Sequence, residues 1–202
     1  MNELFTAALE LQHFCDQRRW RFCFIGGVAV QRWGEPRFTG DADMTLLTGF
    51  GDEERFAVAL LENFTPRRPD ALAFALANRV LLLRAANHIP LDVALGGLPF
   101  EENSIRRASA FVFPTRQSLT TCSAEDLVVH KVFAAREKDW LDVDGILARQ
   151  RGRLDLDLIR SELKPLLALQ EKPESLARLE QKIQEHARPF TTPPPPPNPD
   201  LP

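Results

Sequence analysis

The chain has 202 residues, of which 44% are hydrophobic and 26% are charged, and its formal net charge is −3. This length can bury a sizeable core without metal or disulfide support, and the three cysteines, Cys15, Cys23 and Cys122, cannot all pair. The acidic balance disfavours a large nonspecific nucleic-acid surface, and the longest uncharged apolar run, residues 22–30, is too short to span a membrane. With no signal-peptide pattern at Met1, we expect a cytoplasmic protein without a membrane partner.

The spacing of apolar residues predicts alternating helices and strands up to about residue 122. Helices are expected over residues 3–19, 28–33, 52–64 and 101–108. Strands are expected over residues 20–25, 38–47, 72–76, 79–84, 89–95, 110–113 and 117–121, with a hairpin turn at residues 85–88. We therefore predict an α/β (α+β) fold in which a mixed sheet is flanked by helices.

The rest of the chain is predicted to be helical. Helices are expected over residues 124–136, 138–149, 157–169 and 174–187, and Ser123 resembles a helix N-cap with Asp126 at the capping-box position. We expect an αβ core over residues 1–122, a helical part over residues 123–190 packed on that core, and a disordered proline-rich tail over residues 191–202.

Two aspartates, Asp41 and Asp43, alternate along the predicted strand at 38–47. Their side chains are expected on one face with those of Arg37 and Thr39, while Phe38 and the other apolar residues face the core. At ~3.3 Å per residue, the two carboxylates lie roughly 6.6 Å apart and repel each other. A divalent cation between them relieves this repulsion, and Mg²⁺ prefers such oxygen ligands.

Two further features belong to the same chemistry. Gly26 and Gly27 follow a predicted strand, so their backbone N–H groups can approach a phosphate at the start of the next helix. Asp92 is the lone charged residue on the polar face of the strand predicted at 89–95. If this strand neighbours that of Asp43, three carboxylates converge, which is the number typical of a two-metal phosphoryl or nucleotidyl transfer site.

Each feature alone has a plain alternative. An Asp-x-Asp strand is usually a solvated sheet face, and a Gly-Gly pair is usually a turn. The combination of Gly26-Gly27, Asp41-x-Asp43 and Asp92 in this order and in these strand contexts favours a site.

The same combination resembles the nucleotidyltransferase superfamily, in which an apolar residue and Gly-Gly precede Asp-x-Asp on a strand. The resemblance implies that Asp41, Asp43 and Asp92 bind two catalytic Mg²⁺ ions. It also implies that Gly26 and Gly27 hold the triphosphate of a nucleoside triphosphate (NTP).

Three longer motifs resemble the AbiEii-like nucleotidyltransferases, the toxin class of type IV toxin–antitoxin systems. They are Arg37-x-Thr39-x-Asp41-x-Asp43, Asp92 followed by Leu98-Pro99-Phe100-Glu101, and the block Glu125-Asp126-Leu127 with Lys131, Arg136, Lys138, Asp139 and Asp142. The resemblance implies that Lys131 is catalytic and meets the nucleotide phosphates, and that Asp142 falls near the site. It also implies an RNA acceptor, such as a tRNA end, and a cognate antitoxin protein as partner.

Helical periodicity adds one expectation. If residues 124–142 formed a continuous helix, Lys131, Lys138 and Asp142 would share a narrow face and line a cavity. The alternative is a solvated stripe of paired charges. The candidate nucleotide-binding residues are Gly26, Gly27, Arg37, Thr39, Lys138 and Asp142.

Three functions remain open on the sequence alone. The first is transfer of a nucleoside monophosphate from an NTP to RNA, with a toxin role. The second is transfer to a small molecule of the antibiotic type, and the third is a non-catalytic nucleotide-binding or partner-binding regulator on the same fold. A basic rim around the three acids would favour RNA, and further acidic residues would favour a small molecule.

Overall fold

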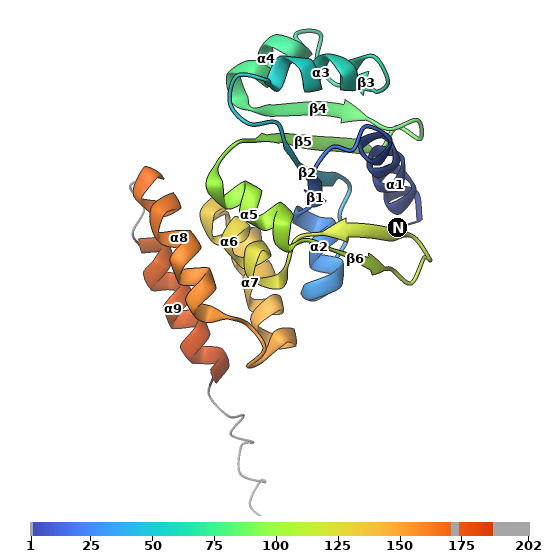
Figure 1. Ribbon diagram of the computed structural model, residues 1–202. Coiled ribbons are helices and arrows are strands. Elements are labelled where there is room, and N and C mark those ends of the chain that lie inside the picture. The colour runs from blue at the N-terminus through green and yellow to red at the C-terminus, as the bar shows by residue number, and fades with distance from the viewer. Residues whose placement is uncertain (1, 171–173, 188–202) are drawn as a thin grey trace, which may run out of the picture.

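A mixed β-sheet forms the centre of the molecule. The computed structural model describes residues 2–170 and 174–187 (Figure 1). In this part of the chain seven strands form one sheet in the order β3-β4-β5-β2-β1-β7-β6. They are β1 (Phe22–Phe24), β2 (Ala42–Leu47), β3 (Thr65–Pro66), β4 (Val80–Arg84), β5 (Pro90–Gly96), β6 (Ser109–Val112) and β7 (Ser118–Thr121). The β2–β5 and β1–β7 pairs are parallel and the other pairs antiparallel, which confirms the predicted mixed sheet.

Helices cover the sheet and bury two hydrophobic clusters. They are α1 (Asn2–Gln17), α2 (Gly26–Trp33), α3 (Glu53–Leu61), α4 (Ala71–Asn78), α5 (Pro99–Arg107), α6 (Ala124–Ala134), α7 (Glu137–Gln150), α8 (Leu156–Gln170) and α9 (Glu174–Ala187). The first cluster joins α1, α3 and α4 to the sheet, and the second joins α5–α9 to α2 and β1. Side chains alternate across β1, so Phe22 and Phe24 enter the first cluster and Cys23 the second.

The register of two central strands decides the position of the site. In the parallel β2–β5 pair, Asp43 lies directly opposite Asp92. On the other side of β5, Asp92 faces Leu82 of the antiparallel β4. The condition for three converging carboxylates, that the strands of Asp43 and Asp92 are neighbours, is therefore met.

The C-terminal helices approach the sheet through α2. Gly145 of α7 packs so closely on the loop after α2 that a Cβ there would lie 3.0 Å from the Glu35 nitrogen. This contact brings α7 beside the loop that carries Arg37. No helix in the described residues combines the length and the apolar character needed to cross a bilayer.

Several predicted elements are wrong or shifted. The strand predicted at 72–76 is the helix α4, because Ala71 and Ala75, four residues apart, are buried as one helical face. The strand predicted at 38–47 begins at Ala42, and the helix predicted at 28–33 begins at Gly26. The predicted tail at 191–202 lies outside the described residues, and the boundary at residue 122 stays a prediction.

The structure separates the helices predicted over 124–136 and 138–149 into α6 and α7, so the condition of one continuous helix from 124 to 142 is not met. Ala135 has a left-handed backbone with φ +54°, which ends α6. α7 then starts after Arg136, whose backbone N–H donates to Asp139 at 3.3 Å. The geometric reason for placing Lys131, Lys138 and Asp142 on one helical face is therefore wrong.

Candidate active site

Three carboxylates converge where β2 and β5 begin. Oxygen atoms of Asp41, Asp43 and Asp92 all lie within 4.8 Å of one another. Asp43 and Asp92 are placed by the strand register, and Asp41 comes immediately before β2. The Thr39 hydroxyl donates to Asp41 Oδ1 at 3.0 Å and so orients that carboxylate. The sequence predicted these three acids, and the structure brings them together.

The cluster holds more negative charge than its surroundings neutralise. Burial, followed by repulsion from Asp41 and Asp92, raises the pKa of Asp43 from 3.8 to about 6. The charge of Lys131 and a hydrogen bond from the Gly27 N–H lower that pKa in part. Burial also raises the pKa of Asp92, even though an arginine lies beside it. A divalent cation would relieve this repulsion, so the cluster has the composition of a metal site.

The arginine beside Asp92 is Arg67, which the sequence analysis did not single out. Its guanidinium forms an ion pair with Asp92 Oδ1, and its backbone N–H donates to the Leu82 carbonyl at 3.0 Å. Leu82 is the β4 residue that faces Asp92. Arg67 therefore reaches the site through the pairing of β3 with β4, and no local sequence signal indicates that.

Close packing explains both glycines at the start of α2. Gly26 has φ +55°, and a Cβ there would lie 1.9 Å from Asp43 Oδ2. A Cβ on Gly27 would lie 2.2 Å from the Thr39 hydroxyl oxygen. Both distances are too short for any side chain, so these positions need glycine. The positive end of α2 thus lies directly against the carboxylate cluster.

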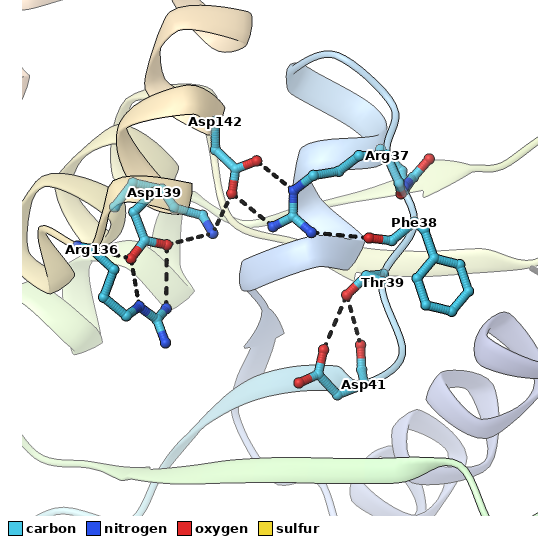
Figure 2. A network of polar contacts seen from close by, with 9 residues as sticks. Arg37, Phe38, Thr39, Asp41, Arg136, Asp139 and Asp142 are labelled. Atoms are coloured by element: carbon cyan, nitrogen blue, oxygen red, sulfur yellow. Dashed lines mark hydrogen bonds and ion pairs between the residues drawn. The ribbon is translucent and has the colours of Figure 1, made fainter.

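A buried network of ion pairs connects α6 and α7 to the loop before β2 (Figure 2). Lys131 is 5% exposed, and its Nζ lies 2.7 Å from Asp142 Oδ2 and 3.1 Å from Asp139 Oδ1. Arg37 binds Asp142 through two hydrogen bonds of 2.6 and 2.8 Å. Burial opposes ionisation, but the hydrogen bonds from Arg37 and Lys131 hold the pKa of Asp142 below its usual value.

The network has an outer cation as well. Arg136, which carries no role in the sequence analysis, donates to Asp139 Oδ2 from Nε at 2.6 Å. Three cations, Arg37, Lys131 and Arg136, thus share two carboxylates, Asp139 and Asp142. The network keeps one positive charge in excess beside the acidic cluster, a distribution suited to an anion bound next to metal ions.

The acids and the network line one cavity of about 500 Å³. Gly26, Gly27 and Thr39 line it, together with Lys138, which is exposed and makes no ion pair with any described residue. Asp142 does not line the cavity itself but binds Arg37 and Lys131, which do. Lys131 and Asp142 therefore contact each other across the break between α6 and α7, and not as neighbours on one helical face.

One predicted orientation is wrong. Phe38 was expected to pack on the core, but it is 85% exposed and lines the cavity. Because β2 begins at Ala42, the alternation of the strand does not extend back to Phe38.

No protein-family model and no curated protein sequence matches this chain. Its fold is similar to a crystal structure of an antigenic nucleotidyltransferase-like protein from Paracoccidioides brasiliensis, with a TM-score of 0.53 and 15% identity over 90% of this chain and 94% of that chain. It is also similar to the solution structure of the antibiotic-resistance factor ANT(2'')-Ia, with a TM-score of 0.50 and 14% identity over 90% of this chain and 97% of that chain. At such identities the likeness concerns the fold, and the AbiEii-like resemblance stays a prediction. The chain has a nucleotidyltransferase-like α/β fold.

Proposed function

We propose that this protein is a Mg²⁺-dependent nucleotidyltransferase that transfers a nucleoside monophosphate from an NTP to an RNA acceptor and releases pyrophosphate. The observation that carries the proposal is the convergence of Asp41, Asp43 and Asp92 beside a cation-lined cavity. A nucleotidyltransferase-like fold supports it.

The three acids fit a pair of magnesium ions. They supply hard oxygen ligands within 4.8 Å of one another, and one arginine, Arg67, offsets one of their three charges. Asp41, Asp43 and Asp92 would hold the ions, which would supply charge stabilisation at the reacting phosphate.

The chain's own groups account for the other requirements of the reaction. The phosphates that leave as pyrophosphate bind at the start of α2, where Gly26 lies, and to Arg136 and Lys138 at the cavity wall. Lys131 is fixed by Asp139 and Asp142, so its charge is positioned before substrate arrives.

The transfer exchanges the phosphoanhydride bond between the α- and β-phosphates of the NTP for a phosphodiester bond to the acceptor. An acceptor hydroxyl attacks the α-phosphorus of the NTP, the bond to the β-phosphate breaks, and pyrophosphate leaves with the electron pair. Asp92 takes the proton of the hydroxyl.

The charges around the cavity favour RNA over a cationic antibiotic as acceptor. Among the described lining residues, one carboxylate, that of Asp139, comes in addition to those of the three acids. Lys131 and Arg136 form ion pairs with it and neutralise its charge. The basic lining residues are Arg37, Lys131, Arg136 and Lys138. Such a rim attracts a polyanion and repels a polycation.

The resemblance to AbiEii-like proteins extends this proposal to a biological role. On that basis the acceptor is a tRNA end, the activity is toxic to the cell, and a cognate antitoxin protein blocks it. Induced expression should arrest growth, and the Asp43→Asn variant should not.

Pyrophosphate release tests the reaction and identifies the acceptor. The protein is incubated with Mg²⁺ and each of the four NTPs, alone, with total RNA, and with cationic antibiotics. Release that requires RNA, with label from the NTP recovered in RNA, is the expected result. Release with an antibiotic alone would support the small-molecule alternative, and NTP binding without release under any condition would support the non-catalytic regulator.

A further inference from the structure

An exposed aromatic ring stands on the cavity that holds the three acids. Phe38 is 85% exposed and lines this cavity, three residues before Asp41. Burying a phenylalanine side chain stabilises a folded protein, so the exposure of this ring gives up that stabilisation. The ring therefore offers apolar surface to whatever enters the cavity.

The backbone that carries the ring is fixed on both sides. The Arg37 carbonyl accepts a hydrogen bond of 2.5 Å from the Gln31 side chain. The Phe38 carbonyl accepts one of 3.1 Å from Arg37 Nη1, and Asp142 holds the same guanidinium. The next residue, Thr39, packs on Gly27 and donates to Asp41. A ring on so well anchored a loop is preorganised for a ligand.

The cavity separates cationic groups from this aromatic ring. Figure 2 shows Arg136 and Asp139 at one end of the polar network and the Phe38 ring at the other, on the side of Thr39 and Asp41. Lys131, Arg136 and Lys138 supply cationic lining residues, and Arg37 adds a further one directly before Phe38. A nucleotide has the matching form, with an anionic phosphate chain and a flat aromatic base.

We propose that Phe38 is a stacking surface for a nucleobase bound at this cavity. The inference rests on the proposed function, because it concerns the nucleotides that such a reaction uses. The base comes from one of two sources, the NTP or the end of the acceptor RNA, and the chemistry of recognition is the same. Stacking on an aromatic side chain tolerates any base, so Phe38 contributes affinity more than base selectivity.

Calorimetric titration tests the inference without transfer. The probes are each of the four NTPs with Ca²⁺ in place of Mg²⁺, tripolyphosphate under the same conditions, and a short single-stranded oligoribonucleotide. Wild type is compared with Phe38→Ala and Phe38→Trp. The matched control is Phe50→Ala, because Phe50 is 67% exposed and lies outside the lining of this cavity.

The expected result is selective for probes that carry a base. Phe38→Ala should weaken binding of the NTPs or of the oligoribonucleotide by about 5- to 150-fold and leave the affinity for tripolyphosphate unchanged. Phe38→Trp, which keeps an aromatic ring, should bind these probes as wild type does. Weaker NTP binding assigns the ring to the NTP base, and weaker oligoribonucleotide binding assigns it to the acceptor.

Other outcomes would overturn the inference. One is that Phe38→Ala binds every base-carrying probe as tightly as wild type does. Another is that Phe38→Ala loses as much affinity for tripolyphosphate as for the base-carrying probes. The third is that wild type binds none of the probes. Phe38-dependent binding combined with a lack of pyrophosphate release would leave stacking intact and refute the transfer reaction instead.

Discussion

Asp43 has the least favourable surroundings of the three acids for carrying its charge. It is largely buried, it lies opposite Asp92, and it packs against Gly26. The residue types and spacing predicted Asp41 and Asp43 as a pair, and Asp92 as the third acid on the condition that its strand neighbours that of Asp43. They could not reveal Arg67, which reaches Asp92 through strand pairing, or the exposure of Phe38, which depends on where β2 begins.

Removing the charge of Asp43 should stabilise the protein when no divalent cation is present. Its folded pKa is about 6 against an ordinary 3.8, so the ionised carboxylate destabilises the fold fully above pH 6 and no longer does so below about pH 4. Asp43→Asn should raise the free energy of unfolding at pH 8 by roughly 1–3 kcal/mol, with the gain disappearing toward pH 4. Urea denaturation at both pH values measures this.

Asp16→Asn is the control for that comparison, because Asp16 is exposed on α1. It should change the unfolding free energy little at either pH. An Asp43→Asn protein that is less stable than wild type at pH 8 would refute the electrostatic argument.

Lys131 should matter mainly for the stability of the fold, and Lys138 mainly for NTP binding. Lys131 is buried between Asp139 and Asp142, so Lys131→Met removes a shared partner from two buried carboxylates and should cost about 3 kcal/mol of stability. Lys138 is exposed, so Lys138→Met should change stability by less than ~0.5 kcal/mol and mainly weaken NTP binding. Thermal unfolding and NTP titration of both variants measure the difference, and equal stabilities would contradict it.

At the scale of elements, the break between α6 and α7 makes the buried network possible. The spacing of apolar residues predicts two separate helices, over 124–136 and 138–149, whereas one shared face for Lys131, Lys138 and Asp142 requires a single continuous helix. The left-handed Ala135 and the Asp139 side chain on the Arg136 N–H instead start a new helix. The sign of the break that the sequence does contain is an acid three residues after Arg136, a capping pattern that helical periodicity hides. The register that places Asp43 opposite Asp92 depends on the pairing of two distant strands, which the alternating pattern of each strand does not give.

The stability of the Ala135→Gly variant distinguishes a broken helix at this position from a continuous one. Ala135 has φ +54°, a conformation that costs an L-residue about 1–2 kcal/mol, so Ala135→Gly should leave stability unchanged or raise it by up to ~1 kcal/mol. In a continuous helix the same substitution would lower stability by about 1 kcal/mol. Urea denaturation decides between them, with Ala59→Gly inside α3 as the destabilised control.

At the scale of the whole molecule, the C-terminal helices pack on the sheet, α2 and α5 and form the second hydrophobic cluster with them. The second hydrophobic cluster combines Cys23 of β1 with Phe100 and Ile105 of α5, and with residues of α6–α9. The spacing of apolar residues predicted that the part of the chain after residue 122 is helical. It could not show which face of the sheet those helices cover, because that depends on contacts between distant segments.

This shared core predicts how a shortened chain behaves. A fragment of residues 1–122 would expose the apolar side chains of α5 and of α2 that α6–α9 cover. It should show no cooperative thermal unfolding by circular dichroism, whereas residues 1–187 should unfold in one transition. Cooperative unfolding of the fragment would mean that residues 1–122 fold independently.

The most direct test of the account is nucleotide transfer by Asp41→Asn and Asp43→Asn, each compared with wild type and with Asp16→Asn. Pyrophosphate release and label incorporation into RNA are measured with Mg²⁺, after circular dichroism has shown that each variant is folded. The account predicts a loss of at least roughly 100-fold in both site variants and full activity in Asp16→Asn. Transfer at the wild-type rate by either site variant would contradict the proposed two-metal site.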